Sequence, residues 1–209
     1  MSQLFVPGFG ALPSFYRAAL PGDWAIHEPP GFRGRHGLED RIAALLRSLE
    51  KHRSPLTLGG HSMGAALAVV VALLEPERVE RLVLIAPAGL PLTKPIAHSL
   101  RDFGKQVTAG VYSSAQLARA VARAVVAPRS TYRLAHAVRE LDLTMQFQAV
   151  RERGIRCDVV ACVGDTLTPL SHCRQIARLA GANYREIDAP GGHMWMVVEP
   201  AQFAAELNT

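Results

Sequence analysis

Cysteine and aromatic residues are scarce in this chain of 209 residues, and each scarcity excludes a class of protein. The three cysteines, Cys157, Cys162 and Cys173, form no C-x-x-C pair and no metal-finger spacing. We therefore expect reduced, packed thiols in a cytoplasmic protein. Aromatic residues make up 6% of the chain and do not alternate with basic residues, which argues against nucleic-acid binding.

Long hydrophobic runs and metal or phosphate motifs are also missing from the sequence. The longest uncharged apolar run, Met63 to Leu74, is too short to cross a bilayer, so we expect no stable membrane insertion. Because the first strand-like run, Gln3 to Val6, begins almost at once, we expect no secretory leader. No cluster has metal-ligand spacing and no glycine-rich phosphate motif occurs, so we expect neither metal nor cofactor.

The apolar runs that are present predict one α/β domain, a mostly parallel sheet flanked by helices. Amphipathic segments fill most of the gaps between the strand-like runs, while residues 91–150 contain no convincing strand. That range predicts helices near Ser114–Val126 and Thr131–Val150, a small helical lid inserted into a core made of residues 1–90 and 151–209. Strands are expected at Gln3–Val6, Trp24–His27, Pro55–Gly59, Val79–Ala86, Cys157–Val163 and Asn183–Ile187.

The pentapeptide Gly60-His61-Ser62-Met63-Gly64 lies between a buried strand and a buried helix. A serine at the apex of such a sharp turn adopts a strained backbone conformation, and its neighbours two residues away must be small. The turn exposes the Ser62 hydroxyl and places the Met63 amide at the helix start, where it faces developing negative charge. The pattern predicts a nucleophile and half of an oxyanion hole.

Two further polar residues follow strand ends. Asp165 lies just after the strand ending at Val163, and His193 follows the last strand in Gly191-Gly192-His193. Carboxyl ends of parallel strands meet at one edge of a sheet, where ligands bind. Asp188, five residues before His193, is the alternative acid, but its position favours capping a turn. His61, His98, His136 and His172 are interpreted as surface or packing residues.

The order Ser62, Asp165, His193 resembles the α/β-hydrolase family, and the similarity runs from Phe5 to Phe203 apart from the lid. The resemblance implies that Ser62 is the nucleophile, His193 its base and Asp165 the acid that orients the imidazole. It also implies that the amides of Phe9 and Met63 form the oxyanion hole. A serine at the apex of this turn excludes the family's dehalogenases and epoxide hydrolases, because those enzymes need an aspartate at the same position.

The sequence departs from that family in two places. Pro7-Gly8-Phe9-Gly10 replaces the usual His-Gly before the oxyanion residue, but the donor is a backbone amide, so this loop can still function. Two strands that usually precede the first one are missing, so the fold is expected to lack them. The outermost strand that this leaves without a neighbour suggests either a homodimer or a terminal strand protected by side chains.

Basic residues gather around the predicted lid. From Pro91 to Arg156 there are eleven Lys or Arg against four acids, while the whole chain has a net charge of +5. Such a lid could steer an anionic substrate, for example an acyl group on a carrier, although solvated helix faces are the simpler explanation. Gly8, Phe9, Trp195 and Met196 are expected to line an apolar substrate pocket.

These patterns together predict a serine hydrolase that cleaves a small-molecule carboxylic ester through an acyl-enzyme. A thioesterase, a lactonase, a carbon–carbon bond hydrolase or an acyltransferase would use the same residues. A non-catalytic ligand-binding receptor of the same fold is the competitor from another class.

Overall fold

Six parallel strands form a single sheet in the computed structural model, which describes residues 2–32, 37–92, 98, 101, 118–119, 121–122 and 125–208. The order across the sheet is β2-β1-β3-β4-β5-β6, and each neighbouring pair runs parallel. The strands are β1 (Ser2–Val6), β2 (Trp24–Ile26), β3 (Leu56–His61), β4 (Val79–Ile85), β5 (Arg156–Cys162) and β6 (Asn183–Ile187). All six predicted strands are confirmed, although β3 continues two residues further than expected, up to the serine itself.

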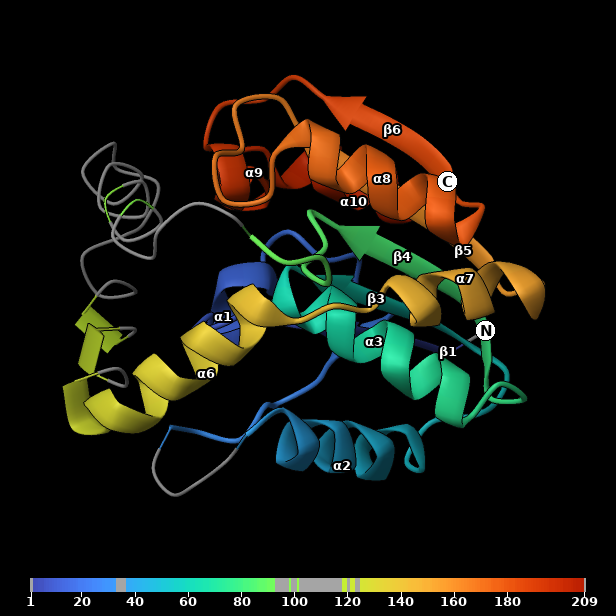
Figure 1. The fold of residues 1–209 in the computed structure, drawn as a ribbon, viewed down its shortest axis with the longest axis horizontal. Helices are drawn as coiled ribbons and strands as arrows, with labels where there is room; N and C mark the ends of the chain where they lie inside the picture. Colours follow the sequence, from blue (N-terminus) through green and yellow to red (C-terminus); the bar gives the residue numbers. More distant parts are fainter. Residues whose placement is uncertain are drawn as a thin grey trace.

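Helices cover both faces of this sheet (Figure 1). One face packs against α2 (Leu38–Leu49), α3 (Met63–Leu74), α7 (Thr144–Glu152) and α8 (Leu170–Ala180), and the other against α1 (Pro13–Tyr16), α9 (Trp195–Val198) and α10 (Pro200–Asn208). Two separate apolar clusters result, because successive strand side chains point to opposite faces. On β4, for example, Leu82 and Leu84 belong to the first cluster and Val83 and Ile85 to the second. The predicted fold class is confirmed.

Several helices differ from the prediction. The helix expected over Thr131–Val150 is interrupted at residues 141–143, which separate α6 (Pro128–Glu140) from α7. Helix α7 packs against α3 and α8, with Phe147 and Val150 fully buried, so it belongs to the helical layer on the sheet. Most of the helix predicted near Ser114–Val126 lies outside the described residues. The division into core and lid stays a prediction.

The C-terminal helix is also shorter than predicted. The sequence from about Trp195 to Leu207 predicts a single helix, but the chain forms a 3₁₀ turn, η1 (Gly192–Met194), followed by α9 and α10. Pro200 begins α10, and a proline is accommodated best at the first position of a helix. None of the helices that the described ranges contain has the length and apolarity that a membrane crossing requires.

Candidate active site

Ser62 occupies a sharp turn between β3 and α3. Its backbone has φ 55° and ψ −119°, a conformation that side-chain-bearing residues rarely adopt and that costs on the order of 1–3 kcal/mol. The Ser62 amide donates to the Ile85 carbonyl at 2.9 Å, and the Ser62 carbonyl accepts from the Ala88 amide at 3.1 Å. The last residue of β4 and the loop after it therefore hold the turn through both main-chain groups of Ser62.

The two glycines that flank this turn have no space for a side chain. A Cβ atom on Gly60 would lie 2.6 Å from the Ala65 nitrogen. One on Gly64 would lie 2.1 Å from the Val6 carbonyl oxygen. Both distances are far below contact distance, so the serine turn requires glycine at these two positions, as the sequence predicted.

The loop after β1 packs directly on the turn. A Cβ atom on Gly8 would lie 3.3 Å from the Ser62 Cβ and 2.7 Å from Nδ1 of His61. Among the described residues, none accepts a hydrogen bond from the amide of Phe9 or of Met63, the two predicted oxyanion donors. Met63 is the first residue of α3, where backbone amides lack intrahelical partners.

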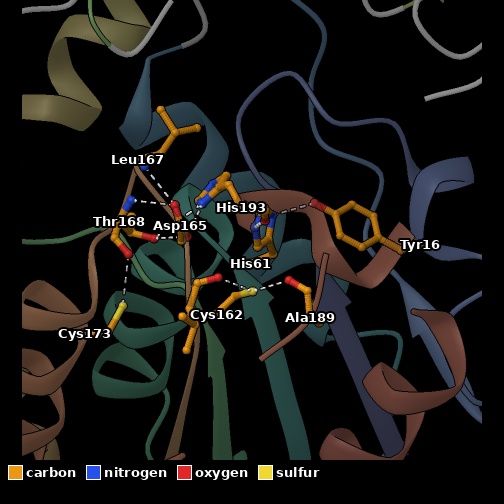
Figure 2. A network of polar contacts seen from close by, with 10 residues as sticks. Tyr16, His61, Cys162, Asp165, Leu167, Thr168, Cys173, Ala189 and His193 are labelled. Atoms are coloured by element: carbon orange, nitrogen blue, oxygen red, sulfur yellow. Dashed lines mark hydrogen bonds and ion pairs between the residues drawn. The ribbon is translucent and has the colours of Figure 1, made fainter. Parts of the chain in front are cut away.

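Asp165 and His193 form a buried pair at the carboxyl edge of the sheet (Figure 2). His193 Nδ1 lies 2.7 Å from Asp165 Oδ2, and the carboxylate side chain is fully buried. This contact brings together the loops that follow β5 and β6. The alternative acid Asp188 is exposed, so Asp165 is the carboxylate that meets the imidazole.

Three further donors surround the Asp165 carboxylate. The amides of Leu167 and Thr168 donate to Oδ1 at 2.8 Å and 3.0 Å, and the Thr168 hydroxyl donates to Oδ2 at 2.7 Å. Burial alone raises the pKa of Asp165, but the charge of His193 and these hydrogen bonds outweigh it and hold the pKa below its ordinary value. The carboxylate therefore stays ionised beside the imidazole.

Two polar residues next to this pair were not predicted as part of the site. His61, interpreted from the sequence as a surface or packing residue, is 1% exposed and hydrogen-bonds to the main chain of His193. Tyr16 hydrogen-bonds to His61 from α1. The only sequence feature that could have pointed to His61 as a site residue is its position next to Ser62. Nothing in the short helix α1 pointed to Tyr16.

The pocket prediction is wrong for Trp195 and Met196. Both side chains are 0% exposed and lie in the apolar cluster beneath α9 and α10, where the Trp195 ring meets Phe203 at 5.6 Å between centroids. The first turn of α9 faces the core there, away from any open surface. Of the other predicted lining residues, Phe9 is half-buried and stacks on Phe32 at 5.5 Å between centroids.

Cavities of about 580 and 490 Å³ occur elsewhere, along α8 and at the amino ends of the strands. Neither is lined by Ser62, Asp165 or His193, so they are separate from the candidate site. Within the ranges that the structure describes, no three His, Cys, Asp or Glu residues are grouped as a metal site would require.

The sequence matches a model of the alpha/beta hydrolase family over residues 3–206. This match spans nearly all of the chain, and the chain therefore belongs to that family. A relative from Mycobacterium phage D29, named provisionally as a non-heme haloperoxidase, is 25% identical over 201 residues, which cover 82% of this chain and 69% of the relative.

Solved structures share the fold at low sequence identity. The N-acyl homoserine lactone degrading enzyme Est816 has a TM-score of 0.73 at 19% identity and covers 98% of this chain and 91% of its own. A serine hydrolase involved in carbazole degradation, CarC, has a TM-score of 0.74 at 18% identity and covers 99% and 89%. A thermophilic esterase has a TM-score of 0.73 at 16% identity, with coverage of 99% and 88%. These likenesses establish the fold.

Proposed function

We propose that this chain is a serine hydrolase that cleaves a carboxylic ester with an apolar acyl group through an acyl-enzyme intermediate. The observation that carries the proposal is the buried Asp165–His193 pair at the same sheet edge as the strained Ser62 turn. A nucleophile, a base and an orienting acid are the groups that acyl transfer by serine requires.

The proposed reaction begins with attack of Ser62 Oγ on the ester carbonyl carbon. His193 Nδ1 is bonded to Asp165, so Nε2 is the ring nitrogen that accepts the serine proton. The amides of Phe9 and Met63 stabilise the oxyanion, each worth about 3 kcal/mol in the transition state. Nε2 then protonates the leaving alcohol. Water, activated by the same nitrogen, attacks the acyl-enzyme, releases the acid and restores Ser62.

The test uses p-nitrophenyl esters of short and medium acyl chains. We expect a burst of p-nitrophenol and a fluorophosphonate adduct on Ser62. Ser62→Ala should lose the burst and the adduct, with turnover falling by at least about a thousandfold. Ser48→Ala, on α2 and outside the site, is the matched control and should behave as wild type. Equal turnover by wild type and Ser62→Ala would contradict the proposal.

Reaction subclass is tested with the same variants. Fold neighbours include a lactone-degrading enzyme and a thioesterase domain, so lactones and acyl thioesters should be compared with esters of equal acyl length. An added alcohol that competes with water for the acyl group would indicate an acyltransferase. Halide oxidation with hydrogen peroxide should be assayed too, because the phage relative carries that name. Ligand binding without serine-dependent turnover would indicate a receptor.

A further inference from the structure

A buried chain of three hydrogen bonds links the loop after β1 to the loop that carries His193. The Gly8 amide donates to the Tyr16 hydroxyl oxygen at 3.2 Å. Tyr16 Oη lies 2.8 Å from His61 Nδ1, and His61 Nε2 lies 3.0 Å from the His193 carbonyl oxygen (Figure 2). These contacts bring together segments of the chain that β-sheet pairing leaves apart, since β1 and β6 are separated by three strands.

The partners fix the direction of every bond in this chain. A carbonyl oxygen only accepts, so His61 Nε2 carries the proton and donates it to His193. His61 Nδ1 then has a free lone pair, which accepts the Tyr16 hydroxyl proton. Tyr16 in turn accepts from Gly8. Both ring nitrogens of His61 therefore have a hydrogen-bond partner, and His61 is neutral in this arrangement.

Packing around His61 leaves little freedom for the loops that it joins. Its ring lies 4.5 Å from the His193 ring and 5.8 Å from the Tyr16 ring, measured between centroids. Burial lowers the pKa of His61 well below its ordinary value, and the nearby His193 adds to this lowering, while Asp165 opposes it. A neutral His61 does not repel the imidazolium that His193 becomes during the proposed reaction.

We propose that His61 and Tyr16 are positioning residues, whose hydrogen bonds hold the His193 main chain and the Gly8–Phe9 loop in register with Ser62. This inference rests on the proposed hydrolase function. Neither side chain reacts; both act through the base and the oxyanion amides. Small displacements of such groups are costly, because about 1 Å can reduce a rate by about a hundredfold.

The test distinguishes the Tyr16 end of this series of hydrogen bonds from the His193 end. Tyr16→Phe removes only the hydroxyl, and His61→Leu removes both ring nitrogens. We expect each to lower kcat on a p-nitrophenyl ester by about tenfold or more while KM changes by less than about twofold, because alignment rather than binding is lost. His61→Gln can still donate to the His193 carbonyl, and it should recover most of the activity that His61→Leu loses.

Phe203→Leu is the matched control, because Phe203 lies in the same apolar cluster as Tyr16 and takes no part in the series of hydrogen bonds. It should lower Tm without lowering kcat, whereas a purely structural role for Tyr16 would make the two variants behave alike. If the wild type neither turns over nor labels at Ser62, the proposed function is wrong. If it does both and Tyr16→Phe and His61→Leu match it, the positioning role is wrong.

A measurement on the unmodified protein covers the case in which variants do not fold. ¹⁵N NMR of histidine-labelled protein at pH 7 should show a neutral imidazole protonated at Nε2, with a slowly exchanging N–H proton, assigned to His61 by its through-space contacts with the Tyr16 ring. A doubly protonated His61, or a neutral one protonated at Nδ1, would overturn the proposal.

Discussion

Thr168 gives the Asp165 carboxylate a hydroxyl donor on the same oxygen that meets the imidazole. Oδ2 accepts from the Thr168 hydroxyl and faces His193 Nδ1, while Oδ1 accepts the two loop amides. Partners of this kind orient catalytic groups without touching the substrate. Removing one donor from a buried carboxylate costs more than the bond itself contributes, because an ionised group is left under-solvated.

We predict that Thr168→Val lowers kcat/KM by about tenfold, because Asp165 loses a donor and holds His193 less firmly. Valine keeps the shape of threonine. Thr168→Ser keeps the hydroxyl and should stay within about threefold of wild type. Steady-state kinetics on a p-nitrophenyl ester would distinguish these variants, and equal impairment of both would show that the hydroxyl is not the cause.

The sequence revealed those site residues whose position relative to a strand end is visible. Ser62, Asp165 and His193 each follow a strand, and a parallel sheet brings its carboxyl ends to one edge. Tyr16 and His61 could not be predicted in the same way, because their partners come from other segments of the chain. Thr168 was missed although its partner Asp165 lies three positions away in the same loop. Tyr16 meets a residue 45 positions away and His61 one 132 positions away.

At the level of elements, the serine turn depends on the close approach of α3 to β1. Gly64 begins this approach, and a Cβ atom there would meet main-chain oxygens of Val6 and Pro7 at 2.1 Å and 2.6 Å. Main chain cannot rotate aside as a long side chain can. A methyl group at this position must therefore displace either the end of β1 or the start of α3.

We predict that Gly64→Ala lowers the free energy of unfolding by about 2–4 kcal/mol, measured by urea denaturation. Gly22→Ala is the matched control, because a Cβ atom on Gly22 meets nothing within 4 Å. It should change stability by less than about 0.5 kcal/mol. A Gly64→Ala variant as stable as the control would show that α3 and β1 can separate without cost.

Strands were easier to predict than the positions at which helices are interrupted or the layer against which a helix packs. Strands buried on both sides form nearly continuous apolar runs, which is why β3, β4 and β5 were visible. The short interruption between α6 and α7, Leu141-Asp142-Leu143, contains no glycine or proline. Its one signal is Asp142, whose carboxylate accepts the Thr144 amide at 2.9 Å. Trp195 and Met196 were predicted to line the pocket because they follow His193 closely in the sequence, and that proximity does not say which layer a short helix faces.

For the whole molecule, the two apolar layers isolate several histidines from water. His27, His61 and His172 are all buried, and burial lowers the pKa of each. For His27 the lowering reaches about 4, and the positive charge of Arg41 adds to it. The basic surplus between residues 91 and 156, a homodimer, an acyl carrier partner and a cytoplasmic location stay predictions, since no described contact bears on them.

Acid should therefore destabilise the whole fold before its carboxylates titrate. An unfolded histidine titrates near 6.5, so between about pH 6.5 and 4 unfolding takes up a proton that folded His27 does not hold, and stability falls as pH falls. This costs about 1.4 kcal/mol per pH unit for each such histidine.

We predict that His27→Gln, which has no such proton to gain, loses about 2 kcal/mol less than wild type between pH 7 and pH 5. Urea denaturation at the two pH values measures this difference, and any constant cost of the substitution cancels. Equal losses in the two proteins would mean that His27 is protonated in the folded state as readily as in the unfolded one.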